Sequence, residues 1–173
     1  MKNTGNLKLT TQGDREIVMT RALDAPRRLV FDAFTKPELV KHWLLGPPGW
    51  SMPICEIDLR VGGVYRYVWR RDGDGSEMGM GGVYREIVAP ERLVATEKFD
   101  QAWYPGEAVG TTVLVEQDGK TTITQTVLYH SREARDAALK SGMERGVAAS
   151  YDRLAELVAS LGTPGMEKGA SPS

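Results

Sequence analysis

The residue most clearly placed to bind a ligand is Gln125, a polar side chain in phase with apolar neighbours. It alternates with Ile123 and Val127, so in a strand all three would point to the same buried face. A buried amide without partners costs about 1–3 kcal/mol, and Gln125 should therefore bond a ligand, a water or a tyrosine hydroxyl. Polar groups inside apolar pockets usually orient ligands, so a binding role is one interpretation. The other is a core glutamine that is satisfied by Tyr65 or Tyr67.

Glu86 is the one candidate for a catalytic acid or base. It falls in phase with Met80 and Tyr84, and an inward carboxylate would have a raised pKa suited to proton transfer. Three glycines between positions 79 and 82 favour a β-bulge, which would shift the phase of the strand. With such a bulge, Glu86 would lie on the surface and have no catalytic role.

Large rings and methionines provide the apolar counterpart of these polar groups. In the segment 64–71, Tyr65, Tyr67 and Trp69 share one face because they alternate with arginines and a valine. Such rings and flexible methionines suit an adaptable apolar pocket, although each of them could also fill a solid core. The residues predicted to line a ligand cavity are Trp50, Tyr65, Tyr67, Trp69, Met78, Met80, Tyr84, Trp103, Ile123, Gln125, Val127, Met143 and Val147.

Metal and nucleophile chemistry find little support in the sequence. His42 and His130 have no Cys, Asp or Glu at ligand spacing, so both are expected on the surface or at helix ends, and no metal or other cofactor is predicted. Cys55 shares a predicted strand face with Ile57 and Leu59. Nothing near Cys55 in the sequence would lower its pKa, so we expect a buried structural thiol.

Composition restricts the class of protein. The chain has 173 residues, 41% hydrophobic and 26% charged, as in a globular protein of one domain. A net charge of −1 argues against nucleic acid as a partner. A single cysteine, a polar N-terminus and the lack of an apolar run near the ~20 residues of a membrane helix predict a cytoplasmic protein without membrane insertion. We expect one domain over 1–173, with an ordered core over 7–161 and a flexible tail over 162–173.

The elements that must position these residues are strands flanked by helices. Residues 15–24 are predicted to form the first strand, and Pro26 and Pro37 each to begin a short helix, because proline suits the first helical position. Residues 52–129 contain apolar runs separated by turn signals such as Asp-Gly, which indicates consecutive antiparallel strands. The expected fold is α+β: a curved antiparallel sheet of about six to seven strands, two short helices after the first strand, and a long C-terminal helix packed across the sheet.

Residues 131–161 are predicted to form that long helix. Gly142 and Gly146 are unusual within it, since each costs roughly 1 kcal/mol relative to alanine. They could let the helix pack closely, leave room for a ligand, or, at Gly142, end a first short helix. The helix has an apolar stripe that advances by three or four residues and consists of Leu139, Met143, Val147, Ser150, Leu154, Leu157 and Leu161.

Four segments of the chain are similar to a known family. They are DAPRRLVFDAFTKPELVKHW (24–43), CEIDLRVGG (55–63), GGVYREIVAPERLV (81–94) and GMERGVAASYDRLAEL (142–157). Together they resemble homologues of the heat-shock-protein-90 ATPase activator, a branch of the START-like superfamily, also called SRPBCC. The resemblance implies a helix-grip fold like that of the birch-pollen allergen, with a curved sheet and a C-terminal helix over a cavity.

The resemblance implies several functions, because these relatives include ligand binders, aromatic polyketide cyclases, self-sacrificing antibiotic-resistance proteins and the cochaperone domain. They share no catalytic motif, and a fold alone does not establish a chemistry. Our first expectation is binding of a small hydrophobic or aromatic molecule between the C-terminal helix and the concave sheet. The alternatives are an enzyme of cyclase or hydrolase type that uses Glu86, and a protein-interaction module with a role in stress response. Homodimerisation would be a modest form of the latter.

Overall fold

The computed structural model describes residues 7–100 and 106–162, which form eight strands and four helices. Trp103 and nearly all of the predicted tail lie outside these residues. The strands are β1 (Lys8–Gln12), β2 (Glu16–Leu23), β3 (Trp50–Ile57), β4 (Val64–Arg71), β5 (Glu77–Val88), β6 (Arg92–Phe99), β7 (Ala108–Gln117) and β8 (Lys120–Leu128). The helices are α1 (Arg27–Thr35), α2 (Pro37–Trp43), α3 (Arg132–Lys140) and α4 (Met143–Leu161).

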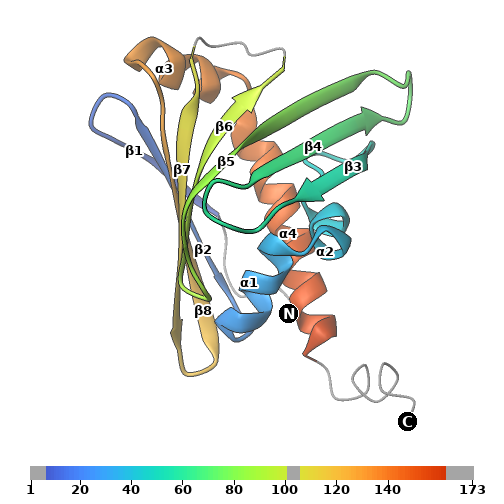
Figure 1. The fold of residues 1–173 in the computed structure, drawn as a ribbon, viewed down its shortest axis with the longest axis vertical. Coiled ribbons are helices and arrows are strands. Elements are labelled where there is room, and N and C mark those ends of the chain that lie inside the picture. Colours follow the sequence, from blue (N-terminus) through green and yellow to red (C-terminus); the bar gives the residue numbers. More distant parts are fainter. Residues whose placement is uncertain (1–6, 101–105, 163–173) are drawn as a thin grey trace.

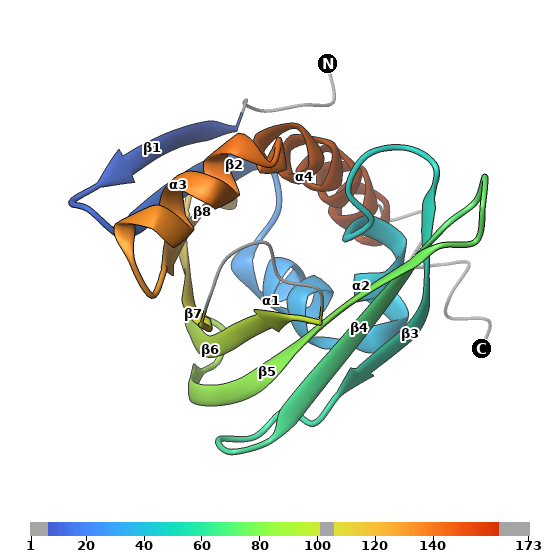
Figure 2. The same cartoon turned by 90° about the horizontal axis from the view of Figure 1, so that it is seen from above.

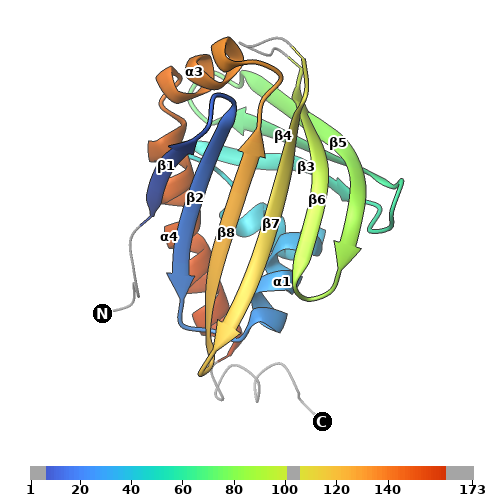
Figure 3. The same ribbon diagram turned by 90° about the vertical axis from the view of Figure 1, so that its left-hand side faces the viewer.

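The strands of the described residues form one antiparallel sheet in the order β1-β2-β8-β7-β6-β5-β4-β3. The sheet is strongly curved, and α4 lies along its concave side (Figure 1). Seen from above, the strands wrap around α1, α2 and α4 (Figure 2). The opposite, convex face of β2, β8, β7 and β6 carries no helix (Figure 3). All four helices therefore lie on the concave side or at the ends of the sheet.

This architecture confirms the predicted α+β helix-grip class and corrects the strand count. The described residues contain eight strands rather than six to seven, and the two short helices follow β2 rather than the first strand. The additional strand is β1, KLTTQ, an edge strand whose side chains are almost all exposed. Because neither of its faces is buried, it shows no alternation of apolar and polar residues, and periodicity could not identify it.

Prolines begin both short helices, as the sequence predicts. Pro26 is the N-cap residue of α1, and Pro37 is the first residue of α2. The indole of Trp43 in α2 donates a hydrogen bond to the carbonyl of Ala33 in α1 at 2.8 Å, which fixes the two helices to each other. Both helices contact α4, and α2 also contacts β3. Their buried residues are Val30, Phe31, Ala33, Thr35, Val40 and Trp43.

The prediction of one long helix over 131–161 is wrong, because α3 and α4 are separate. Gly142 has a φ of 83°, a left-handed conformation that glycine adopts without strain and that interrupts an α-helix. The alternative in which Gly142 ends a first short helix is therefore confirmed. Gly146 lies inside α4, where an added Cβ would be 3.3 Å from Pro47 Cδ. Its missing side chain permits close packing of the loop before β3 against α4.

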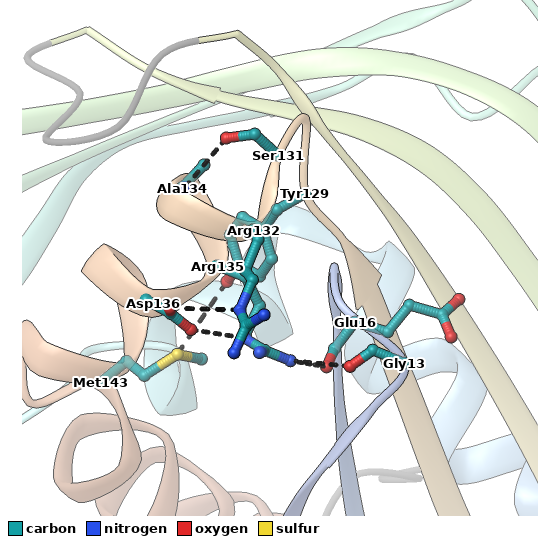
Figure 4. Close-up of polar contacts among 9 residues, drawn as sticks. All are labelled: Gly13, Glu16, Tyr129, Ser131, Arg132, Ala134, Arg135, Asp136 and Met143. Carbon is teal, nitrogen blue, oxygen red and sulfur yellow. Dashed lines mark hydrogen bonds and ion pairs between the residues drawn. The ribbon is translucent and has the colours of Figure 1, made fainter.

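A buried arginine fixes α3 to the turn between β1 and β2 (Figure 4). The hydroxyl of Ser131 caps α3 by accepting a hydrogen bond from the Ala134 amide at 3.1 Å. The guanidinium of Arg135 donates to the backbone carbonyls of Gly13 and Glu16 at 3.4 and 3.3 Å. Because Arg135 is almost completely buried, these bonds hold α3 across one end of the sheet.

A continuous hydrophobic core joins the C-terminal half of α4 to α1, α2 and the sheet. Leu154 and Val158 of α4 are almost completely buried within it. An ion pair between the buried Arg21 and the exposed Asp152 ties this half of α4 to β2, since Arg21 Nη1 lies 2.9 Å from Asp152 Oδ1. Among the described residues, no helix combines the length and the apolarity that crossing a membrane requires.

Candidate ligand cavity

A cavity of about 1290 Å³ lies between α4 and the concave face of the sheet. Its walls come from the strands β2 to β8, the ends of α1 and α3, α2 with the loop that follows it, and the N-terminal half of α4. The wall is mostly apolar, and the cavity is partly open to solvent. The helix and the sheet therefore enclose a real space, beside the core that fills the other half of the molecule.

One wall of the cavity is a row of aromatic rings from β4, β5 and β6. The ring centroid of Tyr65 lies 5.5 Å from that of Tyr84 and 5.0 Å from that of Tyr67. The row continues from Tyr67 to Trp69 at 5.9 Å and from Trp69 to Phe99 at 6.4 Å. These distances are typical of favourable aromatic pairs, so the rings support one another and present a continuous apolar surface.

A second aromatic group comes from the helices. Phe34 and Tyr151 both pack against Trp43, with centroid distances of 4.9 and 5.8 Å. The indole of Trp69 on β4 donates a hydrogen bond to the carbonyl of Leu44, the residue after α2, at 2.7 Å. That bond satisfies the polar atom of the indole inside the protein, so its ring remains as apolar contact surface for a ligand.

Gln125 reaches the cavity wall from β8 and is partnered by α4. Its Oε1 accepts a hydrogen bond from the Tyr151 hydroxyl at 2.6 Å. The prediction that Tyr65 or Tyr67 would partner Gln125 was therefore wrong. The Tyr65 hydroxyl instead donates to the Thr96 carbonyl at 2.6 Å. Gln125 is thus held by a tyrosine of the terminal helix and still lies on the cavity wall.

Residues 24–159 match the model of the family described as activator of Hsp90 ATPase homolog 1-like protein. The chain belongs to this family. Among solved structures, a protein of Rhodobacter sphaeroides is 28% identical with a TM-score of 0.83, over 89% of this chain and 98% of its own. A protein of Chromobacterium violaceum is 30% identical with a TM-score of 0.71, over 83% and 96% of the two chains. Among curated protein sequences, none matches this chain.

The activator-homologue match covers almost the whole cavity and confirms the resemblance found in the sequence. Of the wall residues that the structure describes, Met19 on β2 alone lies outside the matched range 24–159. A protein of Nitrosomonas europaea shows the same fold, at 25% identity and a TM-score of 0.75 over 86% of this chain and 96% of its own. The helix-grip architecture around the cavity is therefore shared with these structures.

Most residues predicted to line a cavity lie on its wall in this family member. Ile123 does not: it is completely buried in the filled core, where it pairs with Arg21 and Leu114 of the neighbouring strands. The prediction was wrong because β8 passes from the cavity into the core between Gln125 and Ile123. That the remaining wall residues bind a ligand stays a prediction. They are Trp50, Tyr65, Tyr67, Trp69, Met78, Met80, Tyr84, Gln125, Val127, Met143 and Val147.

Glu97 is a wall residue that the sequence prediction missed. It lies on β6, and burial raises the pKa of its carboxyl from 4.5 to about 7. An added Cβ at Gly110 of β7 would collide with Glu97 Oε2, so this glycine provides the space for the carboxylate. The alternation that identified Gln125 also applies here, because Glu97 is in phase with Ala95 and Phe99.

Of the two alternatives for Glu86, the structure has the one in which a bulge places it on the surface. Its side chain is exposed, and Oε1 lies 3.2 Å from Arg92 Nε in a surface ion pair. The register of β5 against β6 shifts between Tyr84 and Glu86, which is the irregularity that the nearby glycines favoured. This shift turns Glu86 out of the inward phase of Tyr84.

Cys55 lacks the properties of a nucleophile. It is half-buried opposite Tyr67, and burial raises the pKa of its thiol to about 11, so the thiolate is scarce at neutral pH. His42 and His130 are both exposed. In the part of the chain that the structure describes, no three His, Cys, Asp or Glu residues are grouped so as to hold a metal ion.

Proposed function

We propose that this protein binds a small apolar or aromatic molecule in the cavity between α4 and the concave sheet. The observation that carries the proposal is the cavity itself, about 1290 Å³ in volume and lined mostly by apolar atoms. Ligand pockets commonly measure about 300–1,000 Å³ and combine an apolar wall with a few polar groups. The cavity has that character, with room for a ligand and the water around it.

The composition of the wall supports a ligand with an apolar body. The aromatic row that contains Tyr65, Tyr67 and Trp69 offers broad ring faces. Met78, Met80 and similar flexible side chains can adapt to different shapes. START-like proteins include binders of hydrophobic ligands, and the family match places this chain among their relatives.

The two alternative functions fit the structure less well. A protein-interaction module was expected to have a filled interior, whereas the interior holds a cavity. The hypothesis of an acid–base enzyme loses Glu86 as its candidate residue, because Glu86 is exposed, although Glu97 provides a carboxyl on the cavity wall. Turnover of the bound molecule by Glu97 is therefore the second candidate function, and product analysis after incubation with a binding ligand would test it.

The proposal is tested by titrating the protein with N-phenyl-1-naphthylamine, a neutral probe whose fluorescence rises in apolar surroundings. We expect saturable binding to the wild type. Met143→Trp should fill part of the cavity and weaken binding at least about tenfold, equivalent to about 1.4 kcal/mol. Gln125→Leu should also change the affinity, because it removes a polar group from the wall.

The matched control is Glu156→Trp, which adds the same indole to an exposed position of α4 away from the cavity. Its affinity for the probe should equal that of the wild type. The absence of saturable binding in the wild type would overturn the proposal. Equal affinities for the Met143→Trp and Glu156→Trp variants would also overturn it, because the probe would then bind elsewhere.

A further inference from the structure

Glu97 places one carboxylate on the otherwise mostly apolar wall of the cavity. It is flanked on β7 by two small residues, since Ala108 is its register partner and Gly110 leaves space for Oε2. Burial is the sole cause of its raised pKa, so no described cation or hydrogen-bond donor compensates the charge. The side chain of Glu97 is only partly exposed, so its carboxylate loses much of its hydration without gaining a partner from the described residues.

The other ionisable groups around the cavity do not neutralise this charge. Burial and then the charge of Glu97 raise the pKa of Tyr151 on α4, which shows that the hydroxyl and the carboxylate act on each other. Arg145 is on the wall at the exposed start of α4, but it does not contribute to the pKa of Glu97. The ionisable residues on the described wall, besides Glu97, are Tyr65, Tyr67, Tyr84, Tyr129, Glu144, Arg145 and Tyr151.

A ligand that enters this cavity must compensate or tolerate the carboxylate of Glu97. A neutral, wholly apolar ligand would remove the remaining water from the charge, which is unfavourable. An ammonium group would instead pair with it in a site of low dielectric constant, where the attraction is strong. The same cation would be attracted to the faces of nearby rings, including Tyr67, through cation–π interactions.

We propose that the ligand of this cavity is a lipophilic organic cation, whose ammonium group pairs with Glu97 and whose apolar body lies on the aromatic wall. This inference rests on the proposed function, because it requires that the cavity binds a small molecule. It adds the charge of the ligand and the residue that recognises it. Gln125 and Tyr151, which bond each other on the wall, would stay neutral beside the pair.

The pairing predicts a defined dependence on pH. Glu97 must be ionised to attract the cation, and its pKa of about 7 means that it is mostly protonated at pH 6 and mostly ionised at pH 8. For one site the ionised fraction rises about tenfold between these pH values, so the affinity for a permanently charged ligand should rise about tenfold. A neutral ligand of the same shape should bind no more tightly at pH 8 than at pH 6, because it gains no attraction from the ionised carboxylate and removes water from it.

The test compares two probes by isothermal titration calorimetry at pH 6 and pH 8. The cationic probe is (1-naphthylmethyl)trimethylammonium, whose charge does not titrate, and the neutral probe is 1-naphthylmethanol. The variant is Glu97→Gln, which keeps the shape of the side chain and removes its charge. Glu86→Gln is the matched control, because it makes the same change in an exposed glutamate on the neighbouring strand.

We expect Glu97→Gln to weaken binding of the cation at least about tenfold at pH 8 and to abolish its pH dependence. 1-Naphthylmethanol should bind the variant at least as tightly as the wild type, because the charge that it would desolvate is absent. Glu86→Gln should behave as the wild type with both probes. Equal affinity of the cation for wild type and Glu97→Gln would overturn the inference, as would binding of the neutral probe alone, and both results would leave the proposed function standing. Failure of both probes to bind the wild type would overturn both proposals.

Discussion

The two halves of α4 have different surroundings, although they belong to one helix. Every residue of α4 that is almost completely buried lies at or after Ser150, and these side chains pack against α1, α2 and the sheet. From Met143 to Ala149 the side chains are partly or fully exposed, and most of them line the cavity. The difference teaches that the C-terminal half of the helix holds the fold together, whereas the N-terminal half forms a wall that is free to contact a ligand.

The largest expected difference between the two halves of α4 is in the stability lost when an apolar side chain is truncated to alanine. Leu154→Ala should lower the free energy of unfolding by about 3 kcal/mol, because Leu154 is completely buried and its removal leaves a sealed void. Met143→Ala should cost less than about 1 kcal/mol, since Met143 already borders an open space and its removal creates no new void. Urea denaturation of both variants measures the difference, and equal losses would show that α4 is packed alike along its length.

The next contrast concerns Glu97, an ionisable residue of β6 on the cavity wall. Its carboxyl has a pKa of about 7 in the folded protein against 4.5 ordinarily, so the unfolded chain releases the proton first as pH rises. Stability should be unaffected below pH 4.5, fall between pH 4.5 and 7, and stay reduced above 7. Glu97→Gln removes this loss and should raise the free energy of unfolding by up to about 3 kcal/mol at pH 8.

Urea denaturation of the wild type and of Glu97→Gln at pH 4.5 and pH 8 measures this effect. Glu86→Gln serves again as the control, because Glu86 is exposed and paired with Arg92, and it should give no comparable gain at pH 8. A Glu97→Gln variant with the same stability relative to wild type at both pH values would show that the carboxyl is well hydrated in the cavity.

The sequence predicted the architecture of the fold because that architecture depends on periodicity and on local signals. Pro26 and Pro37 marked the helix starts, and the alternation in β4 placed Tyr65, Tyr67 and Trp69 on the concave face. The edge strand β1 was not predicted, because neither of its faces is buried. An isolated edge strand gains its structure from backbone pairing, which leaves little trace in side-chain pattern.

The candidate site was harder to predict from the sequence, because it depends on where the packed core ends and the cavity begins. Alternation indicates which face of a strand is covered, but the same inward phase leads to the cavity at Gln125 and to the filled core at Ile123. The neighbouring elements, above all α1 and the C-terminal half of α4, decide between the two. For Glu97 the alternation was present in the sequence, whereas the space for its carboxylate comes from Gly110 on another strand.

Ser150 lies at the boundary between the two halves of α4 and tests how firmly the wall is attached. Its buried hydroxyl accepts a hydrogen bond from the Gly46 amide at 2.8 Å, which joins α4 to the loop before β3. Ser150→Ala leaves that amide without its acceptor and should cost about 1–2 kcal/mol. The control is Ser160→Ala, because Ser160 donates to the Leu157 carbonyl within the same helix and its loss should cost under about 0.5 kcal/mol. Equal effects in urea denaturation would mean that the loop is not held by this bond.

The smallest contrast separates the two glycines near the start of α4. Gly142→Ala forces a side chain into a left-handed conformation with a φ of 83°, which should cost about 1 kcal/mol although no atom lies within 4 Å of the new Cβ. Gly146→Ala gains up to about 1 kcal/mol of helix propensity, and its one close neighbour, Pro47, is on an exposed loop that can shift by a few tenths of an ångström. Thermal denaturation should therefore lower the melting temperature for Gly142→Ala and raise it slightly for Gly146→Ala. The reverse order would mean that the loop at Pro47 is rigid and that Gly146, rather than the break at Gly142, sets how closely α4 approaches the rest of the fold.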